Sequence, residues 1–184
     1  MKADSLTPDM HLLVAHPDMP PRTIDRITAQ LSMIGDHGLW LEYSVTPANQ
    51  LLLPAEQESV RKDDLWHSTC FELFVKNPDA DSYLEFNFSP SFEWAAYEFS
   101  GYRSGRRNWP THDPEIWRGD PASTHFHLAV EALPDLRQTA IKVGLSAVIE
   151  EKDGTKSYWA LAHPPGEPDF HHPDCFALEL PPLV

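Results

Sequence analysis

The sequence predicts an all-β domain, built as a sandwich of two antiparallel sheets. Short runs in which apolar and polar residues alternate recur along the chain, a period typical of strands with one buried face. Turn-forming residues separate these runs. The 18 prolines are spread over 184 residues and disfavour long helices. The helical stretches that a parallel α/β sheet needs between its strands are missing.

Six runs carry the alternation and are the expected strands: residues 39–45, 70–75, 83–88, 126–132, 141–149 and 176–180. Every second residue in each run is apolar, so one face of each strand is expected to be buried. In chain order, the apolar faces are Leu39, Leu41, Tyr43 and Val45; Phe71, Leu73 and Val75; Leu84, Phe86 and Phe88; Phe126, Leu128, Val130 and Ala132; Ile141, Val143, Leu145, Ala147 and Ile149; and Phe176, Leu178 and Leu180.

The segments between the runs indicate how the strands connect. Residues 77–81 read Asn-Pro-Asp-Ala-Asp and predict a hairpin turn, as does the Asp-Gly pair in residues 151–154. Residues 24–33 fit helical and strand spacing, and we expect a strand that forms a hairpin with 39–45. Residues 101–125 are expected to be a long irregular connection, a kind of loop that is often functional. Without an internal repeat or linker, residues 1–184 are expected to form one domain.

Charge and composition restrict the partners. The net charge of −14 disfavours nucleic acid and anionic membranes. No run approaches the ~20 apolar residues that span a bilayer, and the start does not read as a secretory signal. With only Cys70 and Cys175 as thiols, we expect a cytoplasmic protein. The basic cluster of Arg103, Arg106 and Arg107 is either a solvated loop or a small anion-binding loop.

The hairpin at 66–89 contains the first candidate site. If its apolar residues share the buried face, Glu72 must share the other face with Glu85 and Asn87. Phe74 and Tyr83 flank them. Carboxylates and an amide beside aromatic rings suit a sugar, because rings stack on a pyranose while the polar groups bond its hydroxyls. The alternative is an outer sheet face that simply meets water.

The segment 158–174 contains the second candidate site. It combines Trp159, His163, Asp169 and His171 with a proline-rich loop, and a stiff loop loses little entropy on binding. The alternative is a structural turn that packs Trp159 and Phe170 under the edge of the sandwich.

Evidence for catalysis is weaker. The chain has neither a nucleophile-elbow motif nor a phosphate-binding loop motif. Paired carboxylates would suit a glycosidase only at a defined separation, which the sequence does not give. His125 and His127 could reach one metal from a strand, but surface imidazoles explain them equally well. We therefore favour a non-catalytic domain, with a metal-assisted enzyme that uses the histidine-rich loops as an alternative.

Two stretches resemble a known family. They are Leu-Trp-His-Ser-Thr-Cys-Phe-Glu-Leu-Phe-Val at 65–75 and Tyr-Leu-Glu-Phe-Asn-Phe-Ser-Pro at 83–90. They resemble family 9 carbohydrate-binding modules and, more closely, the related DOMON-like domains. The segment 158–171 resembles a mostly uncharacterised cytosolic bacterial branch of that group. The resemblance implies an immunoglobulin-like β-sandwich that recognises sugar or haem.

The resemblance also implies a ligand site. In the sugar-binding members two tryptophans clamp a sugar and a nearby glutamate bonds its hydroxyls, and Trp66 and Glu72 match one such pair. Haem-binding members use axial Met and His ligands. Because Trp66 and Glu72 match the sugar-binding members, we expect a carbohydrate or sugar-like metabolite, such as a sugar nucleotide, as the ligand, with no cofactor. A haem or redox module and a protein-interaction domain are the further alternatives.

Overall fold

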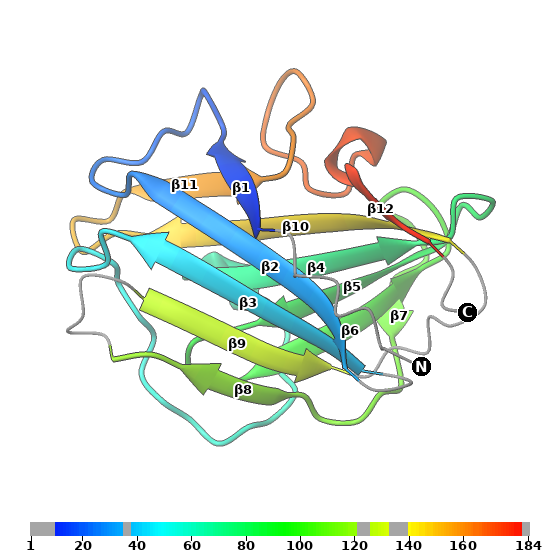
Figure 1. Ribbon diagram of the computed structural model, residues 1–184, viewed down its shortest axis with the longest axis horizontal. Helices are drawn as coiled ribbons and strands as arrows, with labels where there is room; N and C mark the ends of the chain where they lie inside the picture. Colours follow the sequence, from blue (N-terminus) through cyan, green and yellow to red (C-terminus); the bar gives the residue numbers. More distant parts are fainter. Residues whose placement is uncertain (1–9, 35–37, 121–125, 133–139, 182–184) are drawn as a thin grey trace, which may run out of the picture.

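The computed structural model describes residues 10–34, 38–120, 126–132 and 140–181. Nearly all regular structure in these residues is β-strand, as predicted (Figure 1). The strands are β1 (Met10–Ala15), β2 (Arg26–Ile34), β3 (Gly38–Thr46), β4 (Cys70–Lys76), β5 (Tyr83–Phe88), β6 (Trp94–Phe99), β7 (Arg107–Asn108), β8 (Glu115–Arg118), β9 (Phe126–Ala132), β10 (Ile141–Glu150), β11 (Lys156–Ala160) and β12 (Leu178–Leu180). Two 3₁₀ turns, η1 (Leu65–His67) and η2 (Pro173–Cys175), complete the described elements. No helix among these residues is long and apolar enough to cross a membrane.

The strands form two antiparallel sheets that lie one behind the other in Figure 1. The first sheet has the order β1-β2-β3-β9-β8, and the second has the order β7-β6-β5-β4-β10-β11-β1, with β12 also paired to β10. Strand β1 belongs to both sheets, because its first part pairs with β2 and Val14 and Ala15 pair with β11. The β2–β3 hairpin confirms the strand expected within 24–33.

The main core lies between the sheets and uses the alternating residues. Phe71, Leu73 and Val75 of β4 are at most 3% exposed, and their counterparts on β3, β5 and β10 lie in the same cluster. The Tyr43 hydroxyl donates a hydrogen bond of 2.6 Å to the Glu72 carbonyl and links the two sheets. The face prediction for β3, β4 and β10 is therefore confirmed.

A second hydrophobic cluster covers part of the outer face of the second sheet. Phe74 and Tyr83 project from that face and pack edge-on against Phe176, 5.9 and 5.7 Å between ring centroids. Phe176 was expected to share a strand face with Leu178 and Leu180. That expectation is wrong, because β12 begins at Leu178 and Phe176 lies in the chain that folds over the outer face.

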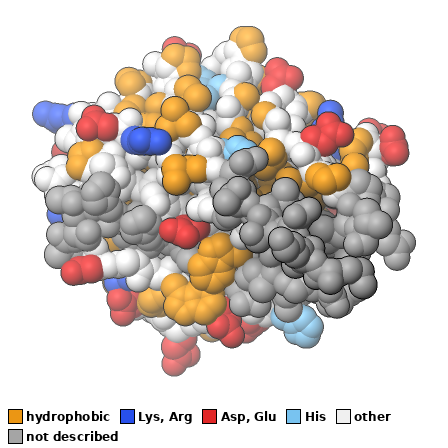
Figure 2. Space-filling view, in the orientation of Figure 1, with side chains coloured by type: hydrophobic (Ala, Val, Ile, Leu, Met, Phe, Trp, Pro, Cys, Tyr) orange, Lys and Arg blue, Asp and Glu red, His pale blue; other side chains and the backbone are white. Residues whose placement is uncertain are grey.

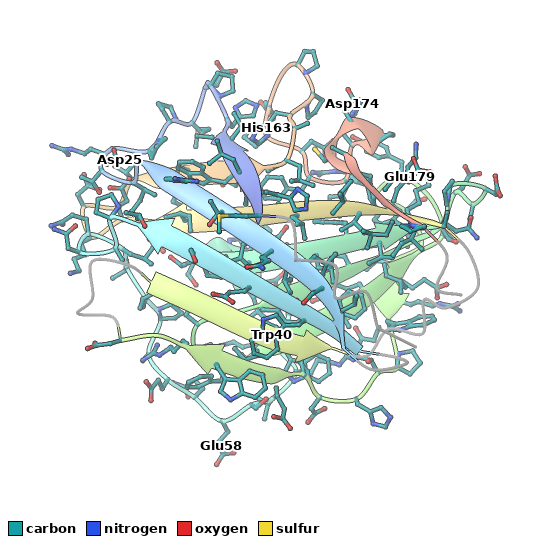
Figure 3. All side chains as sticks on the ribbon, in the orientation of Figure 1. Asp25, Trp40, Glu58, His163, Asp174 and Glu179 are labelled. Atoms are coloured by element: carbon teal, nitrogen blue, oxygen red, sulfur yellow. The ribbon has the colours of Figure 1, made fainter. Side chains whose placement is uncertain are left out.

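The connection expected at 101–125 is less irregular than predicted. It contains β7, which pairs with β6, and β8, which pairs with β9. β8 extends the outer face of the first sheet, the face towards the viewer in Figure 2. There Trp117 of β8 packs against Trp40 of β3, which is labelled in Figure 3. This tryptophan pair lies on the opposite side of the sandwich from the cavity described next.

Candidate functional site

A cavity of about 620 Å³ opens on the outer face of the second sheet. Its volume falls in the range that is usual for small-molecule sites, roughly 300–1,000 Å³. Strands β4, β5, β6, β10 and β11 form its floor, and four loops surround it. The lining residues are Asp18, Met19, Trp66, Glu72, Glu85, Phe99, Arg103, Arg106, Val148, Tyr158, Glu167, Pro168, Phe170 and His171.

The floor of the cavity presents two carboxyl groups. Glu72 of β4 pairs in register with Asn87 of β5, so Glu85 lies on the same face two residues further along. Glu72 accepts a hydrogen bond of 3.2 Å from the Ser146 hydroxyl, and Glu85 accepts one of 2.5 Å from the Asn87 amide. The two glutamates are 4% and 7% exposed. The predicted grouping of Glu72, Glu85 and Asn87 therefore exists, with Asn87 behind Glu85.

Burial changes the acidity of both glutamates. Loss of hydration raises the pKa of Glu72 well above its usual value, and the nearby Glu85 carboxylate raises it further. Burial also raises the pKa of Glu85, although the Asn87 hydrogen bond and the charges of Arg106 and Arg103 oppose the rise. The floor therefore keeps a proton to a higher pH than two exposed carboxyl groups would.

His171 lies against this floor as a neutral ring. Burial, helped by the Arg103 charge, lowers its pKa to about 4. The backbone N–H of Arg103 donates to the Tyr83 hydroxyl, which in turn lies 2.8 Å from Nδ1 of His171. The neutral ring carries its proton on Nε2 when the Tyr83 hydroxyl donates to Nδ1, and on Nδ1 when the Tyr83 oxygen accepts from it. Nε2 faces Oε2 of Glu85, 3.8 Å away, and in the first of these tautomers it directs an N–H towards that oxygen.

Aromatic side chains form the walls. Trp66 lies in η1, where the buried neighbour Leu65 anchors the turn in the second cluster and leaves the Trp66 ring 44% exposed. Its ring packs on His67 with 3.9 Å between ring centroids. Tyr158 and Phe170 line another part of the wall and contact each other. These rings provide the flat apolar surface beside the carboxyl floor.

Asp169 fastens two of the surrounding loops together. It accepts hydrogen bonds from the Tyr102 hydroxyl, from Nη2 of Arg103 at 2.9 Å and from the His171 backbone N–H at 3.1 Å. Burial alone would raise the pKa of Asp169, but these hydrogen bonds outweigh it and lower the pKa. Arg106 reaches the cavity differently, with its guanidinium 4.8 Å from the centre of the Tyr97 ring. Asp169 thus positions His171 and the Arg103 loop and does not line the cavity itself.

Two other residues predicted for the site lie outside the cavity. Trp159 is 4% exposed in the main core, because it pairs in register with Ala147 on the inward face of β10. The neighbouring Tyr158 faces the cavity instead. His163 lies beside β1 (Figure 3), where its Nε2 donates to the Val14 carbonyl and its ring packs edge-on against His16. Trp159 therefore has a packing role, as in the alternative interpretation of this segment, and His163 holds the loop against β1.

The cavity residues do not suit a haem. Its apolar macrocycle would lie on two buried carboxyl groups. Nδ1 of His171 is hydrogen-bonded to the Tyr83 hydroxyl and Nε2 faces Oε2 of Glu85 at 3.8 Å, so another side chain lies in front of each ring nitrogen where iron would bind. Within the described residues, no three His, Cys, Asp or Glu side chains form a metal-binding group. His125 and the side chain of His127 lie outside the described part of the structure.

Sequence reasoning missed several lining residues. Phe99 and Asp18 lie at strand ends or in loops with no motif. Tyr158 could have been found, because it alternates with Trp159 and strand residues one apart face opposite ways. Choosing between them requires the register with β10, which no local pattern reveals. The sequence marks Arg103 and Arg106 only as part of a basic cluster.

Comparisons with known proteins relate the chain to carbohydrate-binding folds. No family model and no curated protein matches it. A protein from Bacteroides uniformis that is proposed to bind carbohydrate has a similar structure, with a TM-score of 0.67 and 15% identity over 94% of this chain and 85% of that one. A family 9 carbohydrate-binding module from Caldicellulosiruptor kristjanssonii in complex with cellotriose gives a TM-score of 0.55 and 8% identity over 90% of this chain and 79% of that one. A family 9 module from the same organism in complex with glucose gives a TM-score of 0.50 and 9% identity, over 90% of this chain and 81% of that one. At these identities the likeness concerns the fold.

Proposed function

We propose that this protein is a non-catalytic binding domain for a carbohydrate or sugar-like metabolite, which it holds in the cavity on the second sheet. One observation carries the proposal: the exposed Trp66 ring and the buried carboxyl groups of Glu72 and Glu85 border the same cavity. An apolar ring face beside fixed hydrogen-bond acceptors matches the two kinds of surface that a pyranose presents.

The polar groups on the floor can recognise hydroxyl groups in both directions. The carboxyl oxygens of Glu72 and Glu85 accept hydrogen bonds, and Nε2 of His171 donates one in the tautomer in which Tyr83 donates to Nδ1. The 3.8 Å between Nε2 of His171 and Oε2 of Glu85 is too long for a direct hydrogen bond. A ligand hydroxyl near both atoms would accept from His171 and donate to Glu85. A ligand group that can only donate or only accept hydrogen bonds would not satisfy both His171 and Glu85.

The structural neighbours support the proposal at the level of the fold. Family 9 modules with this fold are known in complex with glucose and with cellotriose. We propose that the chain is a DOMON-like relative of these modules and works in the cytoplasm, since its two cysteines are free and buried. A cytoplasmic ligand would be a monosaccharide or sugar nucleotide rather than a polysaccharide.

The arrangement of the carboxyl groups supports binding rather than hydrolysis. A glycosidase places its two carboxyl groups on either side of the scissile bond. Here Glu72 and Glu85 project from adjacent strands of one sheet, in a single floor. Both would contact the same side of a bound ring.

A thermal-shift screen of the purified protein tests the proposal. The panel contains monosaccharides, cello-oligosaccharides, sugar nucleotides and haem. A sugar at about 100 times its Kd adds roughly 2.7 kcal/mol to the free energy of unfolding, which raises Tm by about 5–11 °C for a chain of this size. The proposal fails if no sugar raises Tm, and a shift with haem together with a Soret band would replace it by the haem-module alternative.

A further inference from the structure

The buried carboxyl groups of the cavity floor, Glu72 and Glu85, form no ion pair with a lysine or arginine among the residues that the structure describes. The hydrogen bonds to their carboxyl oxygens come from neutral groups, the Ser146 hydroxyl and the Asn87 amide. His171, the nearest imidazole, is neutral because burial lowers its pKa to about 4.

The charges of Arg106 and Arg103 lower the pKa of Glu85, but burial outweighs them and neither arginine forms an ion pair with the floor. Arg103 binds Asp169 through Nε and Nη2, at 3.1 and 2.9 Å, so its charge is already paired. Arg106 is exposed and lies over the Tyr97 ring. Water screens an exposed cation far more than it screens two carboxyl groups on a buried floor.

The remaining lining residues strengthen the negative character of the cavity. Asp18 and Glu167 add two further carboxylates near the opening. The ring faces of Trp66, Tyr158 and Phe170 carry partial negative charge and attract a cation placed above them. A cation in this cavity therefore gains from the floor and from the walls.

A neutral hydroxyl and an ammonium group differ in what they offer this floor. Both donate hydrogen bonds to a carboxylate, but only the ammonium neutralises it. A buried carboxylate without a counter-charge is unfavourable, and a cation that binds it removes this penalty. The floor should therefore favour a ligand with a charged amine over the same ligand without one.

We propose that the sugar bound here carries a positively charged amine, as in the amino sugars, and that its ammonium group lies against Glu72 and Glu85. The proposal rests on the sugar-binding function proposed above. It adds the chemical class of the ligand and a proton exchange on binding. Because the floor keeps a proton to an unusually high pH, the incoming ammonium group displaces that proton into solvent.

Calorimetric titration with matched sugars tests this inference. The probes are glucosamine, N-acetylglucosamine, glucose and glucuronate, at about pH 6, below the pKa of an amine of this kind. Glucosamine is expected to bind at least about tenfold more tightly than glucose or N-acetylglucosamine. Its binding enthalpy is expected to vary between buffers of different ionisation enthalpy, which reports proton release, while that of glucose does not vary.

Two substitutions locate the effect. Glu72→Gln keeps the shape and the Ser146 contact but removes the charge, so the variant is expected to bind glucose and glucosamine about equally, without proton release. Glu85→Gln provides an independent second variant if Glu72→Gln unfolds. Glu115→Gln, an exposed position on β8 at the opposite face of the sandwich, is the matched control and is expected to retain the preference.

The outcomes separate the inference from the proposed function. Equal affinity for glucosamine, glucose and N-acetylglucosamine overturns the amine preference but leaves sugar binding intact. Tighter binding of glucuronate overturns it in favour of an anionic ligand held by Arg106. Absence of binding by every sugar overturns both proposals. A preference for glucosamine that survives in both glutamine variants also refutes the assignment of the ammonium position.

Discussion

Replacement of Trp66 by alanine separates binding from folding. The Trp66 ring is 44% exposed and lies outside both hydrophobic clusters, so its loss should change the free energy of unfolding by no more than about 0.5 kcal/mol. For a chain of this size that corresponds to about 2 °C in Tm. The unliganded variant should therefore unfold almost as the wild type does.

The effect on binding should be much larger. A tryptophan at the centre of an interface typically contributes about 2 kcal/mol or more, which weakens binding roughly 30-fold when it is lost. At a sugar concentration of about 100 times the wild-type Kd, the stabilisation then falls from roughly 2.7 to roughly 0.9 kcal/mol. The Tm shift should fall from about 5–11 °C to about 2–4 °C.

The assay is a thermal-shift titration of wild type and variant with the sugar that gives the largest wild-type shift. Trp117→Ala is the matched control, because Trp117 is 43% exposed but lies on β8 at the opposite face of the sandwich. It should keep the full ligand-induced shift. If Trp66→Ala keeps that shift, or if Trp117→Ala loses as much of it, the ring of Trp66 is not part of the sugar site.

Three further predictions concern buried polar groups. Glu151 is 1% exposed and accepts hydrogen bonds from the backbone N–H groups of Arg22 and Thr23. Glu151→Ala should therefore lower the free energy of unfolding by about 2–5 kcal/mol in denaturant titrations. A loss below about 1 kcal/mol would show that these hydrogen bonds do not hold the two segments together. The folded-state pKa of Glu72 lies above its unfolded value, so the folded state binds more protons, and the free energy of unfolding should fall as the pH rises above about 4.3. Glu72→Gln should flatten this fall in unfolding curves recorded across the pH range, and an unchanged slope would show that Glu72 is not its source. Burial raises the pKa of Cys175 to about 12 and the pKa of Cys70 well above its usual value. Neither thiol should therefore react with a thiol reagent at about pH 8 until the protein unfolds. Rapid labelling of the native protein would contradict the burial of these two side chains.

The polar face of the β4–β5 hairpin could be predicted from the sequence. Side chains alternate strictly along a strand, so burial of Phe71 and Leu73 forces Glu72 to the other face, and the same parity applies to Glu85 and Asn87. The structure confirms this grouping through the Glu72–Asn87 register. The information is local, and a short stretch of sequence contains all of it.

Strand β6 shows where this kind of reasoning fails. Its sequence, Trp-Ala-Ala-Tyr-Glu-Phe, does not alternate between apolar and polar residues, because both of its faces are covered. Trp94 and Ala96 lie in the main core, while Ala95 and Tyr97 lie in the second cluster. A strand buried on both sides loses the period-two signal.

The sequence by itself determined the all-β class, the turns of two hairpins and the face on which the two glutamates lie, since each depends on neighbours a few residues apart. Only the tertiary structure decided that this face is the floor of a cavity rather than a flat outer surface. The walls of the cavity include Trp66, His171 and the loop of Arg103, which reach the floor from distant parts of the chain. Whether such segments meet depends on packing across the whole fold, and no local period records it.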